Sequence, residues 1–386
     1  MTRKPTLSPE TLTTQALGRV SPEFRDLAPP LHPSTTFERA ADGSYPGGRV
    51  YSRDASPAYD QAEALLTELE GGHQSLLFAS GMAAATAVLQ TLRPGQTVLA
   101  PHDMYWALRN WLQAFCQHWG IGLVFYDNAC VDDLAAKLRA TRPRLVWVET
   151  PTNPLLNIGD IEAIAAVAHD AGTKLVVDNT FASSYLQQPL ALGADVVLHS
   201  TTKYLGGHGT SIGGAIVDSG KFPWAQHKAR FKRLNEPDVS YHGVVYTEAL
   251  GAAAYIGRAR VVPLRNMGAA LSPFNAFLIL QGVETLGLRM DRISQNTLKI
   301  AQHLQKHARV EWVNYAGLPD HPEHSLVQKY LSGQGSGVLT FGVPGGRQGG
   351  ERFLDALQLF TRLVNIGDVR TLATHPASTT HRQLTP

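Results

Sequence analysis

Hydrophobic and polar positions follow two alternating periods along residues 57–200. Apolar side chains recur at helical spacing in four segments, over 57–70, 81–92, 105–119 and 161–171. Short continuous apolar runs of strand length lie between or after them, at 76–78, 97–100, 122–126, 145–149, 174–178 and 195–199. Strands that are apolar on both sides and alternate with helices are typical of a mostly parallel sheet with helices on both faces. The pattern therefore predicts an α/β fold for this part of the chain.

The two ends of the chain have a different character. Prolines recur through the first 50 residues with little periodicity between them, and proline fixes φ and lacks an N–H donor. Residues 1–55 are therefore expected to form an extended arm that lies on its own domain or on a neighbouring subunit. Beyond residue 285 an amphipathic pattern over 288–307 precedes strand-like runs, a Gly-rich turn over 342–350 and a helix near 351–359. This predicts a smaller α+β domain over 286–386, after a large domain over 56–285.

Composition narrows the class of protein. The chain has 386 residues, 44% of them hydrophobic and 17% charged, so it can bury a large core. Its 34 basic and 32 acidic residues give a net charge of +2, without the basic excess expected of a nucleic-acid-binding protein. No apolar run approaches the roughly 18 residues of a membrane span. Cys116 and Cys130 are the only cysteines, which fits a reducing compartment. We therefore expect a cytoplasmic enzyme with no nucleic-acid or membrane partner.

An acid, hydroxyls and a lysine follow two strands of the predicted sheet. The strand at 174–178 ends in Asp178, and the strand at 195–199 runs into Ser200, Thr202 and Lys203. In an open α/β sheet, ligands bind outside the carboxyl ends of the strands, so these groups are expected on one rim. A lysine can hold pyridoxal phosphate as a Schiff base while an acid pairs with the pyridinium nitrogen. The set therefore indicates pyridoxal phosphate as the cofactor.

A phosphate site is also expected. Hydroxyls and backbone N–H groups at the start of a helix can hold a phosphate group. Gly81 and Met82, which follow Ser80 at the start of an Ala-rich helical segment, supply such a start.

Simpler interpretations exist for each residue alone. A lysine after a strand is usually a solvated surface group, and an acid there is often only a helix cap. The Gly-rich segment 206–209 is no phosphate loop of the GxxxxGK[ST] kind, because no GK[ST] is present. His375 and His381 are accompanied by no further ligand set, so no metal site is predicted. Cys116 on a helical pattern is expected in the core rather than as a nucleophile.

Together the segments resemble the Cys/Met-metabolism family of pyridoxal-phosphate enzymes, from about His32 to Pro386. This family includes cystathionine γ-synthase, cystathionine lyases, methionine γ-lyase and O-acetylhomoserine sulfhydrylase. The motifs that carry the resemblance are VYSR at 50–53, ETPTNP at 149–154, VVDNT at 176–180, HSTTK at 199–203 and HPASTTHRQL at 375–384. The resemblance implies fold type I, in which helices flank a mostly parallel sheet and a smaller C-terminal α+β domain follows.

The resemblance also implies roles for single residues. Lys203 would hold the cofactor and later move protons, and Asp178 would pair with the pyridine nitrogen. Ser200 and Thr202, with the backbone of Gly81 and Met82, would hold the phosphate.

Further matches surround the cofactor ring and reach across subunits. Tyr105 would stack on the ring, where it is a candidate for activating the incoming amine, and Glu149 and Asn153 would lie near the ring and its phenolic oxygen. Tyr51 and Arg53 match a pair that reaches the phosphate of the neighbouring subunit. The active site would then be shared, which implies at least a homodimer, with a homotetramer as the expected assembly.

The two halves of the chain resemble different members of the family. From residue 199 onward the segments are similar to O-acetylhomoserine sulfhydrylases, whereas ETPTNPLLNIGDI at 149–161 is closer to cystathionine synthases and lyases. The implied reaction is γ-replacement on an O-acylhomoserine by a sulfur donor, with O-acetylhomoserine and sulfide giving homocysteine and acetate. Cystathionine γ-synthesis, or γ-elimination from methionine or cystathionine, is the alternative on the same scaffold.

Three departures from the family pattern bear on the substrate site. Ser56-Pro57-Ala58 stands where Asn-Pro-Thr is usual, and Trp106 stands where a glycine is expected beside the ring. An Arg-Leu-Ser-Val-Gly motif follows the HPAS segment in the family, and its arginine binds the substrate α-carboxylate. No such motif is found here, so the C-terminal domain is expected to be incomplete at its end, and Arg370 is a poor substitute. An alternative of another class is therefore a cofactor-binding dimer with little catalysis.

Overall fold

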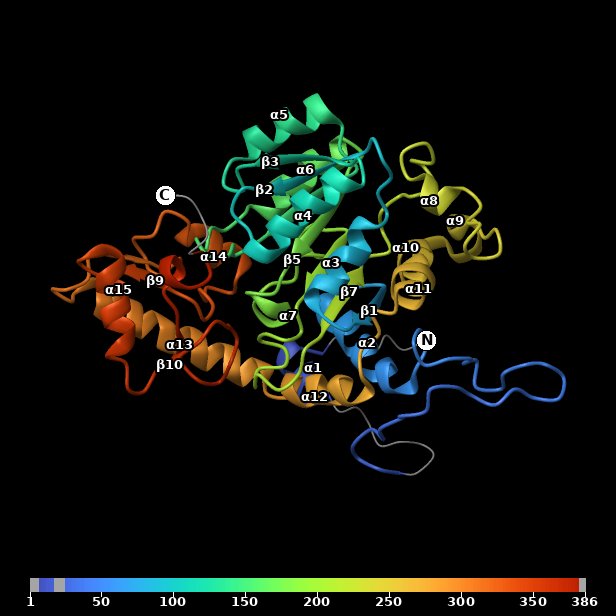
Figure 1. Ribbon diagram of the computed structural model, residues 1–386, viewed down its shortest axis with the longest axis horizontal. Coiled ribbons are helices and arrows are strands. Elements are labelled where there is room, and N and C mark those ends of the chain that lie inside the picture. Colours follow the sequence, from blue (N-terminus) through green and yellow to red (C-terminus); the bar gives the residue numbers. More distant parts are fainter. Residues whose placement is uncertain (1–6, 17–24, 382–386) are drawn as a thin grey trace.

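A seven-stranded sheet forms the centre of the protein, with the strand order β1-β7-β6-β5-β4-β2-β3 (Figure 1). The computed structural model describes residues 7–16 and 25–381. The strands are β1 (Gln74–Phe78), β2 (Thr97–Pro101), β3 (Gly122–Tyr126), β4 (Leu145–Glu149), β5 (Lys174–Asp178), β6 (Val196–His199) and β7 (Gly214–Asp218). Strands β2, β3, β4, β5 and β6 all run parallel to one another. Strand β7 runs antiparallel to both of its neighbours, β6 and β1. The predicted mostly parallel sheet is confirmed.

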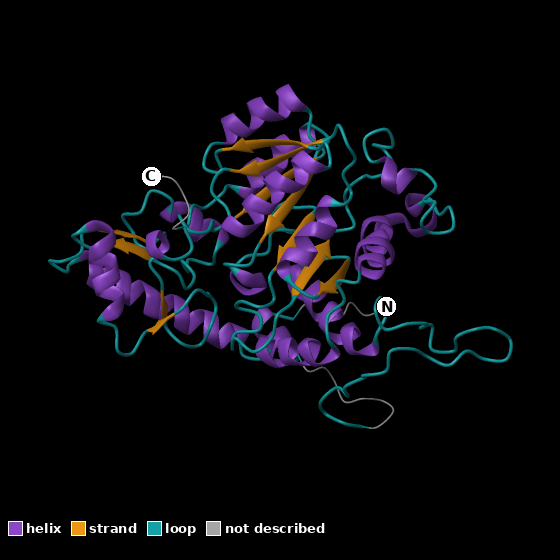
Figure 2. Cartoon of the chain, in the orientation of Figure 1, coloured by secondary structure: helices purple, strands orange, loops and turns teal. Residues whose placement is uncertain are grey.

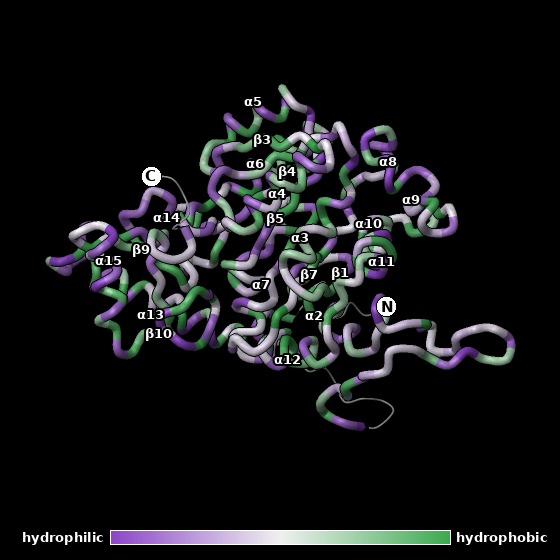
Figure 3. The backbone as a smooth tube through the Cα atoms, viewed as in Figure 1, coloured by the Kyte–Doolittle hydropathy of each residue, from purple (hydrophilic) through white to green (hydrophobic). Residues whose placement is uncertain are grey.

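Alternate residues of one strand enter two separate hydrophobic cores, which explains why the strands read as continuous apolar runs. In β4, Val146 and Val148 belong to one core, and Leu145 and Trp147 belong to the other. Every residue of β4 is buried. The strands of the central sheet are mainly hydrophobic, as Figure 3 shows.

Helices cover both faces of this sheet (Figure 2). Buried residues of α2 (Pro57–Glu70), α5 (Val131–Thr141) and α6 (Ile161–Asp170) join the first core, and those of α3 (Gly81–Leu89) and α4 (Trp106–His118) join the second. A short helix α7 (Ser183–Leu186) lies between β5 and β6 in the chain. The helices predicted between the strands are therefore present, and they lie where a parallel sheet requires them.

Ser56-Pro57-Ala58, one of the departures from the family pattern, lies at the start of α2. Ser56 is the N-cap of α2, and its hydroxyl accepts a hydrogen bond from the backbone N–H of Ala58 at 3.3 Å. Pro57 occupies the first helical turn, where its missing N–H costs nothing. The helix ends at Gly71, whose φ of +64° is the left-handed conformation that glycine adopts without strain.

Helices dominate the chain after the sheet. They are α8 (Lys232–Asn235), α9 (Tyr246–Leu250), α10 (Ala254–Ala259), α11 (Arg265–Met267), α12 (Pro273–Val283) and α13 (Leu286–Gln305), with a 3₁₀ turn at Gly251–Ala253 and a π turn at Arg260–Leu264. None of the described helices is both long and apolar enough to cross a membrane.

The C-terminal part is built on α13 and two small sheets. Strands β8 (Trp312–Asn314) and β9 (Thr340–Gly342) pair antiparallel, and β10 (Thr361–Arg362) pairs parallel with β11 (Leu372–Ala373). Helices α14 (His324–Tyr330) and α15 (Gly346–Asp355) and a 3₁₀ turn at Pro376–Ser378 complete it. The last residues of the predicted domain, 382–386, lie outside the described part.

The expected Gly-rich turn over 342–350 is wrong in its second half, because α15 begins at Gly346. The glycines of this helix allow neighbouring groups to pack closely against it, and they do not form a loop. A Cβ at Gly349 would lie 2.0 Å from the carbonyl oxygen of Pro344, and a Cβ at Gly350 would lie 2.6 Å from the ring of His375. The helix also ends earlier than the expected helix near 351–359.

The N-terminal arm is not extended throughout. Helix α1 (Pro9–Thr14) is capped by Ser8, and it packs against α2 and α13. The rest of the described arm runs outward from the body as a long exposed loop (Figure 1). Thr36 and Tyr51 pair in an antiparallel bridge across this loop. Residues 1–6 and 17–24 of the predicted arm lie outside the described part.

Candidate active site

The carboxyl ends of three adjacent strands bring the candidate residues to one edge of the sheet. Glu149 ends β4, Asp178 ends β5 and His199 ends β6. Glu149 and Asp178 are directly opposite each other in the parallel register. Lys203 lies four residues beyond His199, in a turn at the same edge. The structure therefore places two carboxylates and a lysine at the edge where α/β sheets bind ligands.

The carboxylate of Asp178 is held on one side by Thr180. Its Oδ1 accepts hydrogen bonds from the Thr180 backbone N–H at 3.0 Å and from the Thr180 hydroxyl at 2.6 Å. The Thr180 hydroxyl in turn accepts from the backbone N–H of Ser200 at 2.9 Å. Burial raises the pKa of Asp178 above its usual value, and the hydrogen bonds from Thr180 offset only part of this effect. A negatively charged carboxylate in this position stabilises a protonated nitrogen that binds next to it.

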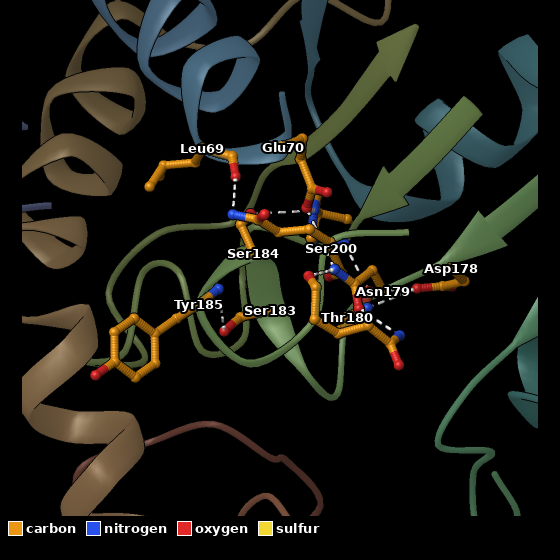
Figure 4. A network of polar contacts seen from close by, with 12 residues as sticks. Leu69, Glu70, Asp178, Asn179, Thr180, Ser183, Ser184, Tyr185 and Ser200 are labelled. Atoms are coloured by element: carbon orange, nitrogen blue, oxygen red, sulfur yellow. Dashed lines mark hydrogen bonds and ion pairs between the residues drawn. The ribbon is translucent and has the colours of Figure 1, made fainter. Parts of the chain in front are cut away.

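A buried polar network lies behind this carboxylate (Figure 4). The Nε2 of His199 lies 2.6 Å from Oε1 of Glu70, and the Nδ2 of Asn179 donates to the same oxygen at 3.2 Å. The Nε2 of Gln187 donates to Oδ1 of Asn179 at 3.0 Å. All four side chains are buried. The network therefore fixes Asn179 and His199, which are the chain neighbours of Asp178 and Ser200.

The side-chain amine of Lys203 points to the C-terminal part of the chain. Its Nζ donates to Oδ1 of Asn365 at 2.5 Å. Burial lowers the pKa of Lys203, so a larger share of the amine is neutral than in water. Sequence reasoning did not identify Asn365, because the contact joins residues 162 positions apart.

A glycine allows the segment around Asn365 to reach the lysine. Gly367 has a φ of +75°, and a Cβ there would lie 2.5 Å from the backbone nitrogen of Tyr204 and 2.7 Å from the carbonyl carbon of Lys203. The backbone N–H of Val369 donates to the carbonyl oxygen of Gly207 at 3.0 Å. The segment 365–369 therefore packs backbone against backbone on the turn that carries Lys203.

Arg289, on α13, supports the same turn from the other side. It donates to the carbonyl oxygens of Tyr204 at 2.7 Å and of Gly282 at 2.6 Å, and to the Thr285 hydroxyl at 3.0 Å. Burial lowers the pKa of Arg289 to about 10. The planar fork of a guanidinium can serve several acceptors at once, which a lysine ammonium cannot match in geometry. Arg289 therefore ties the lysine turn to α12 and α13.

The start of α3 lies against Ser200. The Ser80 hydroxyl accepts from the backbone N–H of Ala83 at 3.1 Å and so caps the helix. A Cβ at Gly81 would lie 2.8 Å from Cβ of Ser200, so only glycine permits this approach. The backbone N–H groups of Gly81 and Met82 are among the first four of the helix, which have no partner within it. The structure thus brings Gly81, Met82 and Ser200 together.

Thr202 has a different environment from Ser200. Its hydroxyl donates to the carbonyl oxygen of Gly213 at 3.2 Å and accepts from the backbone N–H of Gly213 at 3.1 Å. These contacts tie the lysine turn to the residue just before β7.

Glu149 organises the backbone around two further candidates. Its Oε2 accepts from the backbone N–H of Tyr105 at 2.9 Å, and its Oε1 accepts from the backbone N–H of Asn153 at 2.8 Å. Burial and the negative charge of Asp178 raise the pKa of Glu149 well above its usual value. Tyr105 precedes α4, and 44% of its surface is exposed. Glu149 is thus placed to set the positions of Tyr105 and Asn153.

Tyr51 and Arg53 are not brought to this edge within one chain. Both lie on the exposed arm, and the Arg53 guanidinium lies 4.9 Å from the centre of the Tyr51 ring. Among the described residues, no side-chain hydrogen bond or ion pair joins either of them to the lysine turn. The structure leaves the two side chains available on the arm.

The remaining residues noted in the sequence have definite contacts. The ring of Trp106 lies 5.7 Å from that of His381, so the C-terminal segment returns to the start of α4. The guanidinium of Arg370 is held by both carboxylate oxygens of Asp368 at 2.8 Å. That cation is therefore already paired. The imidazole of His375 lies 3.0 Å from the Ser378 hydroxyl.

Comparison with known proteins shows to which family the chain belongs. The family model of the "Cys/Met metabolism PLP-dependent enzyme" matches residues 10–386. The chain belongs to this family. It is 43% identical to O-acetyl-L-homoserine sulfhydrylase 1 of Thermus thermophilus, over 98% of this chain and 91% of that protein.

Two solved structures are similar over nearly the whole chain. A putative O-acetylhomoserine (thiol)-lyase of Campylobacter jejuni, which holds N'-pyridoxyl-lysine-5'-monophosphate, has a TM-score of 0.91 and 32% identity, covering 98% of this chain and 91% of that one. A cystathionine gamma synthase of Xanthomonas oryzae pv. oryzae has a TM-score of 0.84 and 32% identity, covering 99% and 89%. The resemblance to the Cys/Met-metabolism family, its fold and its pyridoxal-phosphate cofactor are thus confirmed.

The edge fits this cofactor on structural grounds. Asp178 offers a buried carboxylate, and Lys203 offers a half-buried amine of lowered pKa. Gly81, at the start of α3, lies so close to Ser200 that a side chain at this position would fill the space between them. The free backbone N–H groups of the first helical turn lie beside this space and suit an anion. These are the three groups that the nitrogen, the aldehyde and the phosphate of pyridoxal phosphate require.

Proposed function

We propose that this enzyme carries out γ-replacement on an O-acylhomoserine, with O-acetylhomoserine and sulfide giving homocysteine and acetate. In this reaction the Cγ–O bond of the ester breaks, acetate leaves with the bonding electrons, and the sulfide sulfur forms a bond to Cγ. No oxidant or reductant is needed. The observation that carries the proposal is the 43% identity to a protein named O-acetyl-L-homoserine sulfhydrylase, over 98% of this chain.

The cofactor and substrate would be held by residues of the sheet edge. Pyridoxal phosphate supplies an electron-accepting ring when it is bound. Asp178 keeps a proton on the ring nitrogen, and Ser200 with the N–H groups of Gly81 and Met82 binds the phosphate. The Thr202 hydroxyl donates to the carbonyl oxygen of Gly213 in this structure. By turning toward the phosphate it would complete the set of phosphate ligands.

Lys203 has two tasks in this proposal. Its Nζ would bind the cofactor, and the freed amine would move the Cα proton and a Cβ proton of the substrate and supply protons to both carbons again once the C–S bond has formed. Taking up either proton needs a neutral amine, and burial favours that form by lowering the pKa of Lys203. Asn365 orients the amine through the 2.5 Å hydrogen bond from Nζ to its amide oxygen.

Tyr105, Glu149 and Asn153 shape the ring pocket. We infer that the Tyr105 ring covers the cofactor and that its hydroxyl helps to activate the incoming amine. Glu149 acts through the backbone N–H groups it holds at Tyr105 and Asn153. The Asn153 side chain would lie near the phenolic oxygen of the cofactor.

The exposed N-terminal arm is the feature from which we infer how the subunits assemble. We infer at least a homodimer, with a homotetramer as the expected form, in which Tyr51 and Arg53 reach the phosphate bound by the partner subunit. Their position on an exposed loop, away from their own lysine turn, supports this arrangement. We place the enzyme in the cytoplasm, since its two cysteines form no disulfide.

The test is a product assay by mass spectrometry. The purified protein, loaded with pyridoxal phosphate, receives O-acetylhomoserine with sulfide and cysteine in competition. Homocysteine as the main product supports the proposal, whereas cystathionine assigns the chain to γ-synthesis. Release of 2-oxobutanoate from methionine or cystathionine without a second thiol assigns it to γ-elimination. No product from a protein that retains the visible band of bound cofactor identifies a cofactor-binding protein with little catalysis.

A further inference from the structure

A cavity of about 430 Å³ lies at the edge of the sheet opposite the lysine turn. Its wall includes Thr97, the first residue of β2, and Arg144, which immediately precedes β4. Strand β4 ends in Glu149 at the active-site edge, and β2 runs parallel to it, so the first residues of both strands lie at the other edge. The cavity is therefore separate from the candidate active site.

Three arginines dominate the wall of this cavity. Arg142 follows the C-terminus of α5, Arg144 precedes β4, and Arg230 precedes α8. No Asp or Glu lines the cavity. Within the described residues, none of the three guanidiniums lies within ion-pairing distance of a carboxylate, and Glu236 at the end of α8 is paired with Arg93 and Lys232.

Backbone carbonyls hold two of the guanidiniums in place. Arg144 donates from Nε to the carbonyl oxygen of Arg230 at 3.0 Å, and from Nη1 to that of Arg142 at 3.3 Å. Arg230 donates from Nη2 to the carbonyl oxygen of Pro143 at 2.6 Å. The cations are thus fixed beside one another by neutral acceptors, which orient them without cancelling their charge.

The electrostatics of the cluster favour an anion. Burial and the neighbouring arginines lower the pKa of both Arg144 and Arg230. The C-terminus of α5 contributes about half a negative charge, which offsets only part of one guanidinium. Two or more positive charges remain without a counter-charge from residues 7–16 and 25–381. Thr97 lies on the same wall. The side chain of Gln96, also on this wall, donates to the carbonyl oxygen of Arg230 at 3.2 Å and so helps to hold that residue in place.

We propose that this cavity, defined by Arg142, Arg144 and Arg230, is a binding site for a phosphate-type dianion, either free or carried on a small metabolite. Guanidinium groups match the oxygens of a phosphate in geometry as well as charge. A volume of about 430 Å³ exceeds what a bare oxyanion occupies and lies within the range of small-molecule sites. A phosphomonoester is therefore the ligand class that uses the whole cavity.

Calorimetric titration of the enzyme loaded with pyridoxal phosphate tests this site. The probes are inorganic phosphate, AMP as a small phosphomonoester, and adenosine as the matched uncharged molecule, all at one ionic strength set with chloride, since salt screens such contacts. Saturable binding of AMP or phosphate, with no binding of adenosine, is expected. AMP binding more tightly than phosphate assigns the site to phosphorylated metabolites, and equal affinities assign it to the free oxyanion.

Variants locate the binding. Arg142→Gln removes the guanidinium of an exposed residue, and it is expected to weaken binding about tenfold, the effect of one charge-assisted hydrogen bond. Arg230→Gln is expected to act in the same direction. Arg139→Gln, on the exposed surface of α5, is the control and should keep the affinity of the parent within about twofold. Unchanged affinity in Arg142→Gln, equal binding of adenosine and AMP, or no saturable binding of either anion would overturn the proposal.

Discussion

The Nζ of Lys203 and the Oδ1 of Asn365 lie 2.5 Å apart, although 162 positions separate the two residues in the chain. The contact joins the lysine turn after β6 to the C-terminal part of the protein. It gives the C-terminal segment a direct part in positioning the reactive amine.

Asn365→Ala is expected to lower kcat about tenfold and to change KM less. The amine keeps its chemistry but loses the acceptor that orients it, and a misplaced catalytic group costs rate rather than affinity. Steady-state kinetics with O-acetylhomoserine and sulfide measure both parameters. Asn365→Ser, which retains a hydroxyl acceptor, should recover part of the rate, and Asn296→Ala on the exposed face of α13 is the control. Equal losses of kcat in the Ala and Ser variants would contradict a positioning role.

Lys203→Ala is expected to lower turnover by about 10³-fold or more, because it removes the group proposed to move protons. The visible absorption band of the lysine-bound cofactor should also disappear. Lys299→Ala, which removes an exposed lysine on α13, should leave both readouts unchanged. Normal turnover by Lys203→Ala would exclude this residue from catalysis.

Asp178→Asn is expected to retain the cofactor and to lower kcat by about 10²–10³-fold, the usual cost of removing a preorganised electrostatic group. The amide is nearly the same shape, but it does not hold a proton on the ring nitrogen. Absorbance measures the bound cofactor, and the product assay measures the rate. The matched control is Asp127→Asn, which changes an exposed carboxylate after β3. A near-normal rate in Asp178→Asn would remove the role proposed for this carboxylate.

Glu70→Leu is expected to lower the free energy of unfolding by about 3 kcal/mol, since it leaves the buried Nε2 of His199 and amide of Asn179 without their shared acceptor. Chemical denaturation of the variant and its parent, both loaded with cofactor, measures this difference. Glu68→Leu changes an exposed residue of the same helix and should cost far less. Similar losses in the two variants would argue against the network as the cause.

The pH dependence of cofactor attachment follows from the lowered pKa of Lys203. Only the neutral amine can attack the cofactor aldehyde, so the attachment rate rises with pH and levels off above the pKa of the amine. Because burial lowers that pKa from 10.5, the rate should reach half of its plateau below pH 10.5. Stopped-flow absorbance, after apoenzyme and pyridoxal phosphate are mixed at a series of pH values, measures the midpoint. A midpoint at or above 10.5 would contradict the effect of burial.

Strand positions were predictable where the interior of the strand is continuously apolar. The runs at 122–126, 145–149 and 174–178 coincide with β3, β4 and β5, because no polar position interrupts them. The short helices between 232 and 267 were not predicted, since they lack a sustained apolar period and one turn contains Pro263. The prediction of a turn over 342–350 was wrong where α15 begins, because the glycines there allow close packing within a helix and do not form a turn.

Residues at strand ends were predictable as candidates, but their supporting contacts were not. Asp178 stands out because it ends an apolar strand, and Lys203 stands out because it lies four residues beyond the end of the next strand. Glu70 and Asn365 act through partners 129 and 162 positions away, and no local pattern reveals such a distance. Glu70 was in part detectable, because it ends an amphipathic helix on the buried side.

The direct contact between Gly367 and the backbone of Lys203 and Tyr204 restricts how the protein can move. At Gly367, backbone lies directly against the backbone of Lys203 and Tyr204, so no side chain at this point can change rotamer and absorb a shift. Any hinge motion that carries segment 365–369 outward therefore takes the amide of Asn365 away from the amine at the same moment. Opening of the C-terminal part and hydration of the reactive lysine are thereby a single event.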